Sequence, residues 1–193
     1  MVHHERMSDL TDVPAPHGVS AFPVRPMTVD DCARVAGIRA GGWRHAYRGL
    51  VPQPYLDRMD ITADAGRHRA RLLSRDGGRG DLVAEGEGGA VVGWAAFGPY
   101  RDGEVRTDDA ELYALYLDPG HIGRGVGRTL LAEVTRRCAA AGHRDMYLWV
   151  LKENARARRF YERAGFGADG AEEPFEVDGV AVPEVRYAKR LAD

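Results

Sequence analysis

A glycine-rich segment in the second half of the chain has the residue types needed to bind an anion. It reads GRGVGR, Gly123–Arg128, and stands between an apolar run and an amphipathic pattern. Glycine lets the backbone approach a ligand closely, and the first N–H groups of a helix have no partner inside that helix. The helix dipole adds to their attraction for phosphate oxygens, and Arg124 and Arg128 supply guanidinium donors. We expect a phosphate-bearing ligand here, although three glycines can also serve only to make a turn.

The spacing of this loop argues against two familiar phosphate-binding motifs. It lacks the Gly-Lys-Ser/Thr ending of a P-loop, and Gly-x-Gly-x-Gly differs from the Gly-x-Gly-x-x-Gly of dinucleotide-binding folds. A nucleotide-dependent dehydrogenase would also need a ribose-binding acid, which we do not find. A second signal is required to name the ligand.

Two strand–helix units must position the loop. The apolar run ELYALYL, Glu111–Leu117, predicts a strand buried on both faces. After Pro119 and the loop, a long helix is predicted by apolar residues four apart, at Val126, Leu130, Val134 and Cys138. The second unit is a strand over Met146–Val150, followed by a helix over Ala155–Ala164 that Asn154 caps and Gly165 ends.

The other expected elements complete a domain in which strands and helices are mixed. The domain should begin with a strand at Phe22–Pro26 and a helix from the Thr28 cap to Ala40, which a break at Gly41 and Gly42 ends. We then expect a short helix with Trp43, Ala46 and Tyr47, a turn of helix within Leu50–Met59, and a helix over Thr62–Leu73. Paired strands over Asp81–Glu85 and Ala90–Phe97 and a charged connection over Tyr100–Ala110 lead to the strand before the loop. A hairpin of Phe175–Val177 and Glu184–Lys189 ends the chain. The fold class is therefore α/β (α+β).

Composition narrows the class of protein. The 193 residues are 44% hydrophobic and 29% charged, as in a globular protein, and no run approaches the roughly 20 apolar residues that span a membrane. Residues 1–20 are polar and without period, so we expect a disordered tail before a single domain over 21–193. Because this tail also lacks the apolar core of a signal peptide, we expect a cytoplasmic protein.

Charge and cysteine content argue against two kinds of partner. A net charge of −2 disfavours binding to nucleic acid through a general positive field. The two cysteines, Cys32 and Cys138, fall among apolar helical positions and read as small buried hydrophobes. No His-Glu-x-x-His or Cys-x-x-Cys motif is present, so we expect no metal site.

Both strand–helix units resemble motifs of the GNAT superfamily of N-acetyltransferases. The first, LYALYLDPGHIGRGVGRTLL, is similar to its acyl-CoA-binding motif, and the second, LWVLKENARARRFYERAGF, to the motif that follows it. The segments VRPMTVDDCARVAGIRAGGWRHAYRGL and VVGWAAFGP are similar to the first strand–helix pair and the central hairpin, so the likeness covers about residues 22–190. It implies a mixed, mostly antiparallel sheet flanked by helices, with two splayed strands that hold the coenzyme.

The resemblance also implies a set of acetyl-CoA contacts. In the family the pantetheine arm lies between the splayed strands and the loop amides hold the pyrophosphate, while the motif asparagine, here Asn154, contacts the arm as well as capping its helix. The implied binding residues are Leu115, Tyr116, Leu117, Gly123, Arg124, Gly125, Val126, Gly127, Arg128 and Asn154. One departure is Ile122, where the family usually has Gln or Arg; because the contacts there are largely backbone, we expect weakened rather than lost binding.

Three residues are candidates for the chemistry. Tyr161, at the position of the family's motif tyrosine, would protonate the departing thiolate, and the amide of Leu117 would hold the oxyanion. Glu111 is the candidate base, directly or through water. Each side chain has a simpler interpretation: Tyr161 as an aromatic core residue, Glu111 as a solvated carboxylate at a strand end. The base typical of enzymes that acetylate protein N-termini does not carry over, since Trp149 occupies its position.

We therefore predict an N-acetyltransferase in which a primary amine, of a small molecule or a lysine, attacks acetyl-CoA directly in a ternary complex. No nucleic acid, membrane or metal is expected to take part. Trp43, Tyr47 and Tyr55 lie in the segment that usually roofs the acceptor pocket, although Trp43 can equally be a core residue. The alternative is a module of the same fold that senses acyl-CoA without turnover. The acceptor and the oligomeric state, a homodimer among the options, stay open.

Overall fold

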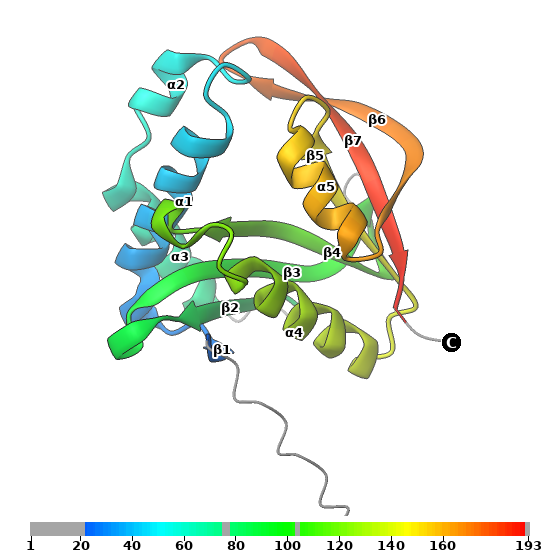
Figure 1. Cartoon of the computed structure of the whole chain (residues 1–193), viewed down its shortest axis with the longest axis horizontal. Helices are drawn as coiled ribbons and strands as arrows, with labels where there is room; N and C mark the ends of the chain where they lie inside the picture. Colours follow the sequence, from blue (N-terminus) through cyan, green and yellow to red (C-terminus); the bar gives the residue numbers. More distant parts are fainter. Residues whose placement is uncertain (1–21, 75–77, 103–104, 192–193) are drawn as a thin grey trace, which may run out of the picture.

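The computed structural model describes residues 22–74, 78–102 and 105–191, which fold around one seven-stranded sheet (Figure 1). The strand order is β1-β2-β3-β4-β5-β7-β6, and among these neighbours β4 and β5 are the parallel pair. The strands are β1 (Val24–Pro26), β2 (Gly80–Glu85), β3 (Val91–Asp102), β4 (Val105–Leu117), β5 (Asp145–Leu151), β6 (Gly167–Val177) and β7 (Val180–Arg190). The expected mixed, mostly antiparallel sheet is confirmed. The tail expected over residues 1–20 lies outside the described residues.

Helices cover both faces of the sheet. They are α1 (Cys32–Ala46), α2 (Gln53–Asp57), α3 (Ile61–Ser74), α4 (Val126–Ala140) and α5 (Ala155–Arg163). Figure 1 shows α1, α2 and α3 gathered on one side of the molecule, whereas α4 runs beside β2 and β3 and α5 lies alongside β5 and β7. The sheet therefore has an α1 face and an α4 face.

Each face has its own apolar core. On the α4 face Leu130 and Val134 pack with buried residues of β4, β5 and β7, including Leu112, Leu148 and Tyr187. On the α1 face the buried residues include Val35, Ile38, Val83 and Trp94. A third cluster joins α1 and α2 to the ends of β5, β6 and β7, through Trp43, Leu56, Leu151, Val177 and Val182. This last cluster fixes the position of α1 relative to the C-terminal hairpin.

The two parallel strands separate soon after they pair. Their register contains three pairs, the last of which joins Leu112 to Leu148, although both strands continue beyond this point. The strand over Glu111–Leu117 is consequently not buried on both faces along its whole length, as the sequence had suggested. Leu112 is buried, but the residues from Tyr113 to Leu117 are half-buried because β5 no longer lies beside them.

The predicted break at Gly41 and Gly42 is wrong, since α1 runs through both residues. Two glycines inside a helix each cost about 1 kcal/mol relative to alanine, so packing must override their propensity. A Cβ on Gly42 would lie 3.0 Å from the ring of Tyr116. Glycine here allows α1 to approach β4 closely.

Two connections are longer strands than the sequence pattern predicted. The charged segment over Tyr100–Ala110 belongs largely to β3 and β4, which form a long hairpin. The C-terminal hairpin also extends well beyond Phe175–Val177 and Glu184–Lys189, to the full lengths of β6 and β7. Charged residues on an exposed strand face hide the alternating pattern, and pairing with the neighbouring strand overrides it.

Truncating the core of the α4 face tests this packing. Leu130 has 0% of its surface exposed, so Leu130→Ala should lower the free energy of unfolding by about 2–5 kcal/mol. Leu73 on α3 is 63% exposed, so Leu73→Ala should change the free energy of unfolding by less than about 0.5 kcal/mol. Urea denaturation of both variants measures the difference, and equal losses would contradict the burial of α4 described above.

Candidate active site

The glycine loop presents a row of unpaired amides at the start of α4. Gly123 and Gly125 have φ of 84° and 95°, a conformation in which a side chain would be strained. The first hydrogen bond into the helix runs from the Thr129 N–H to the Gly125 carbonyl, at 3.0 Å. Among the described residues, no acceptor is bonded to the N–H of Gly123, Gly125, Val126, Gly127 or Arg128. These donors, at the positive end of the helix dipole, are available to an anion.

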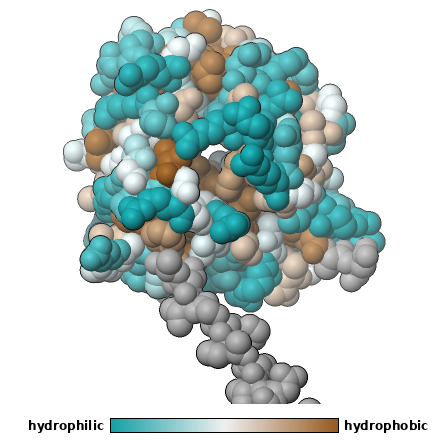
Figure 2. All heavy atoms as spheres, viewed as in Figure 1, coloured by the Kyte–Doolittle hydropathy of each residue, from teal (hydrophilic) through white to brown (hydrophobic). Residues whose placement is uncertain are grey.

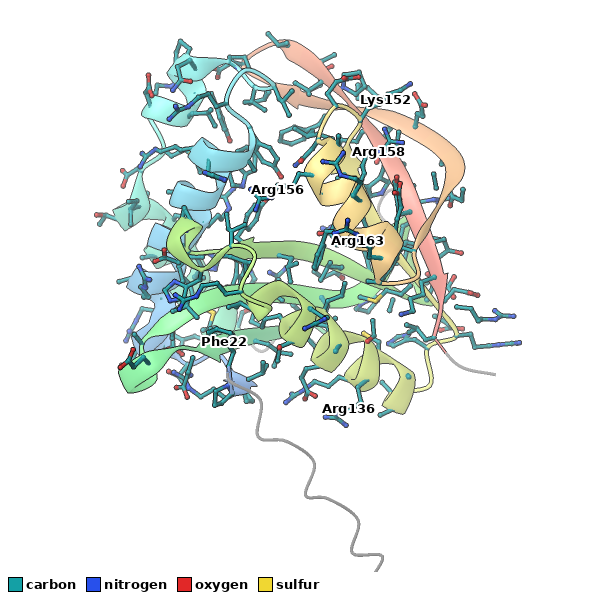
Figure 3. The ribbon with its side chains drawn as sticks, viewed as in Figure 1. Phe22, Arg136, Lys152, Arg156, Arg158 and Arg163 are labelled. Carbon is teal, nitrogen blue, oxygen red and sulfur yellow. The ribbon has the colours of Figure 1, made fainter. Side chains whose placement is uncertain are left out.

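The loop itself carries two basic side chains. Arg124 and Arg128 are exposed and form no ion pair with any other described residue. Figure 3 shows Arg156, from the start of α5, in the space between α5 and α1. Sequence reasoning missed Arg156, although the run ARARR on α5 was a visible signal. Ile122 is half-buried beside the loop and adds no charge.

The free edge of β4 continues from the loop. The Asp118 N–H donates to the Val92 carbonyl at 2.9 Å, and the register pairs Tyr116 with Trp94 and Leu115 with Ala95. Because backbone groups of an antiparallel strand point alternately to either side, Tyr116 is bonded toward β3, like Asp118. The N–H and C=O of Leu115 and Leu117 therefore point away from β3, toward the gap left by β5. Of the three expected strand contacts, Tyr116 has its backbone occupied and offers its ring instead.

Tyr161 enters this gap from the α4 face. It is a buried member of the core on that face and packs edge-on against Phe160 and Phe166, so its role as a core aromatic is real. Its hydroxyl forms no hydrogen bond with any described residue, and it is not fully shielded from solvent. Burial, together with the nearby Tyr116, raises the pKa of Tyr161 well above its usual value. The phenol therefore holds its proton at neutral pH.

Asn154 caps α5, as predicted. Its side-chain Oδ1 accepts a hydrogen bond from the Ala157 N–H at 3.1 Å. The cap uses only the oxygen of the amide, which leaves the Nδ2 donors free of any partner among the described residues. Capping and ligand binding are thus compatible in one side chain.

On the α1 face, beside a hollow between α1 and α5 that we call the chamber (Figure 2), lies a packed aromatic cluster. Its rings belong to Trp43, Tyr47, Tyr55, Tyr116 and Phe175. The hydroxyl oxygens of Tyr47 and Tyr116 are 3.2 Å apart. The space-filling view shows the molecule hollowed between α1 and α5, with apolar side chains inside a hydrophilic rim (Figure 2). Trp43 belongs to a buried cluster, which confirms its interpretation as a core residue, while its place over an acceptor pocket stays a prediction.

Glu111 is neither free nor solvated. It is 6% exposed, and its carboxylate accepts hydrogen bonds from Arg101, from Nη2 at 3.1 Å and from the backbone N–H at 3.2 Å. The expectation of a solvated carboxylate at a strand end is therefore wrong. Both oxygens of the carboxylate accept hydrogen bonds from Arg101, so Glu111 is already occupied by a partner in the protein. No sequence pattern predicts this pair, because Arg101 lies across the β3–β4 hairpin from Glu111.

Neither cysteine is placed as a nucleophile at this gap. Both cysteines are buried as predicted, and burial raises the pKa of the Cys138 thiol to about 11. No group of three or more histidine, cysteine or acidic side chains within the described ranges is placed to hold a metal ion. None of the helices described is long and apolar enough to cross a membrane.

Comparisons with known proteins agree with this geometry. Residues 43–166 match the model of the acetyltransferase (GNAT) family. The chain is 33% identical to the uncharacterized N-acetyltransferase YuaI of Bacillus subtilis over 162 residues, which cover 84% of this chain and 89% of that protein. It is 29% identical to the L-amino acid N-acyltransferase MnaT of Escherichia coli over 137 residues, 70% of this chain and 74% of that protein. The structure of YncA from Salmonella typhimurium with acetyl-CoA is similar with a TM-score of 0.68 and 25% identity, covering 90% of this chain and 96% of the other.

Two substitutions at Asn154 separate its cap oxygen from its amide donors. Asn154→Ala removes the bond to Ala157 and should lower the free energy of unfolding by about 1 kcal/mol. Asn154→Asp keeps an oxygen at the helix start and should retain wild-type stability within a few tenths of a kcal/mol. Thermal or urea unfolding measures both. Equal destabilisation by the two variants would show that the cap is not the stabilising interaction.

Proposed function

The chain belongs to the GNAT family of acetyltransferases, and we propose that it transfers the acetyl group of acetyl-CoA to the primary amine of a small molecule by direct attack in a ternary complex. Membership of the family makes it an acyltransferase. The coenzyme, the acceptor class and the roles of individual residues are the proposal.

The observation that carries the proposal is the continuity of two sets of unpaired backbone groups. The amides of Gly123–Arg128 suit a pyrophosphate, and the free edge of β4 at Leu115 and Leu117 suits the amide groups of a pantetheine arm. An extended ligand that carries both groups can therefore satisfy the loop and the strand together. Coenzyme A has this composition, whereas ATP has no amide-bearing arm to pair with β4. The residues present thus fit acetyl-CoA.

The chemistry divides between groups already in place. The amine nitrogen forms a bond to the thioester carbonyl carbon, and the Leu117 N–H, which faces the gap, donates to the oxyanion that develops. When the carbon–sulfur bond breaks, Tyr161 gives its proton to the departing sulfur and recovers one from solvent. The attacking nitrogen loses its own proton to a base or to water. Neither cysteine takes part, because both thiols are buried in the core.

Two observations favour a small-molecule acceptor over a lysine in a protein. The chamber between α1 and α5 lies within a hydrophilic rim, so it suits a compact ligand (Figure 2). Two similar proteins are named for free amino acids or their analogues: MnaT, and an L-methionine sulfoximine/L-methionine sulfone acetyltransferase of Salmonella typhimurium, 33% identical over 85 residues. Aromatic rings also favour an acceptor with an apolar or cationic body.

Calorimetric binding of acetyl-CoA, beside NAD and ATP as controls, is the first test. We expect saturable one-site binding of acetyl-CoA and much weaker binding of the two controls. A panel of small primary amines, and a lysine peptide, should then be screened by the release of free thiol. Binding without turnover of any amine would favour the sensing module. Binding of ATP or NAD in place of acetyl-CoA would exclude the proposed chemistry.

The role of Tyr161 predicts a selective loss of turnover. Tyr161→Phe removes a hydroxyl that has no partner among the described residues, so stability and acetyl-CoA affinity should stay near their wild-type values. The rate constant kcat should fall by about 10²-fold, the low end of the range for general acids, because a thiolate already leaves readily. Steady-state kinetics with the best amine of the panel measure this. Undiminished kcat would reduce Tyr161 to a core aromatic.

A further inference from the structure

A carboxylate that the sequence did not single out lies where the gap opens on the α1 face. Glu184 on β7 pairs with Leu151, the last residue of β5, and so lies beyond the point where β5 leaves β4. Its neighbours Val185 and Tyr187 belong to the core of the α4 face. Because side chains alternate along a strand, Glu184 faces the α1 side, as does Val182 beneath Trp43.

The Glu184 carboxylate is half-buried and has no hydrogen bond or ion pair with any described residue. Three cations of the neighbouring strands and of the turn after β5 bond to other groups. Arg186 bonds to Asp169 and to the Tyr100 hydroxyl, Lys152 to Glu172, and Arg101 to Glu111. An unpaired, partly buried carboxylate is costly, and such groups concentrate at functional sites.

The groups that face Glu184 are acidic or neutral. Glu173 of β6 is its cross-strand partner, Glu111 approaches from β4, and the Tyr47 and Tyr116 hydroxyls approach from α1 and β4. Burial, followed by the charges of Glu173 and Glu111, raises the pKa of Glu184 to about 7. A carboxylate of this kind binds a proton more strongly than an ordinary one, yet is largely ionised slightly above neutral pH.

We propose that Glu184 is the catalytic base of the transfer, accepting the proton that the acceptor nitrogen loses as it bonds to the acetyl carbon. The proposal rests on the proposed function and deepens it. The cationic amine first gives one proton to the Glu184 carboxylate, directly or through one water, and Glu184 releases that proton to solvent. The freed nitrogen lone pair then forms the C–N bond, and the second proton that the nitrogen loses passes to Glu184 by the same route. The base thus acts from the α1 face, while Tyr161 donates from the α4 face.

This assignment replaces Glu111, which the sequence favoured. Both oxygens of the Glu111 carboxylate accept hydrogen bonds from Arg101 and the residue is almost fully buried, whereas the Glu184 carboxylate has no such partner. Glu111 instead contributes negative charge that keeps the Glu184 proton affinity high. The same charges favour a cationic amine in the chamber before its deprotonation.

The test compares pH profiles of kcat/KM with the best amine. In the wild type the acidic limb should bend near pH 7. Glu184→Gln should lower kcat/KM at pH 7 by about 10²-fold or more and remove this bend. Its activity should then climb steadily with pH, because more of the amine is already deprotonated in solution. Glu184→Asp should recover part of the loss.

Two variants on β6 act as matched controls. Glu176→Gln alters an exposed carboxylate of the same strand and should leave the profile unchanged. Glu173→Gln removes the charge opposite Glu184, so the pKa of Glu184 in the folded protein should fall. The bend in kcat/KM should then move to lower pH, and kcat/KM at high pH should change little. Unfolding curves and calorimetric acetyl-CoA binding should match the wild type for every variant, which separates loss of the base from loss of the fold.

The proposal would be overturned if Glu184→Gln kept the wild-type pH profile of kcat/KM. It would also be overturned if the bend disappeared in Glu111→Gln but not in Glu184→Gln, and Glu111 would then be the base. Failure of the proposed function has a different signature, because the wild-type protein itself would then release no thiol with any amine of the panel.

Discussion

The separation of β4 from β5 is the constraint on which the rest of the structure depends. Each strand keeps its other neighbour along its length: β4 pairs with β3, and β5 pairs with β7 through seven residues. After Leu112 and Leu148 they no longer pair with each other, so β4 has a half-buried edge of unsatisfied N–H and C=O groups. Buried backbone groups without partners are costly, and the sheet is therefore built to receive an extended polar ligand there.

The same separation connects the two faces of the sheet. In the reaction proposed above, Tyr161 acts on the reacting carbon from the α4 face, and Glu184 acts from the α1 face. Proton donation and proton acceptance can then occur on opposite sides without the two groups neutralising each other. Packing maintains this division, since Gly42 lets α1 lie against Tyr116 and Trp43 joins α1 to the hairpin of β6 and β7.

Sequence reasoning succeeded where the signal is local. The glycine loop, the helix that follows it and the Asn154 cap depend on spacing over a few residues, and the structure contains all of them. It failed where distant residues decide. The close approach of β4 overrides the glycine pair in α1, and pairing with neighbouring strands extends the hairpins through charged segments. Likewise, the pairing of Arg101 with Glu111 and the isolation of Glu184 depend on strand register, which no short window reveals.

The two sides of the site therefore differ in how the sequence encodes them. Phosphate and pantetheine would be held mainly by backbone groups, which need glycines at Gly123 and Gly125 and a free strand edge but few particular side chains. For this reason Ile122 can occupy a position next to the loop without removing any of the free amides. The acceptor side is built instead from side chains of α1, α2, β4, β6 and β7 that converge only in the fold. A coenzyme class can consequently be inferred from one short motif, whereas the acceptor must be sought in the chamber, where an acidic and aromatic lining favours an amine that arrives as a cation.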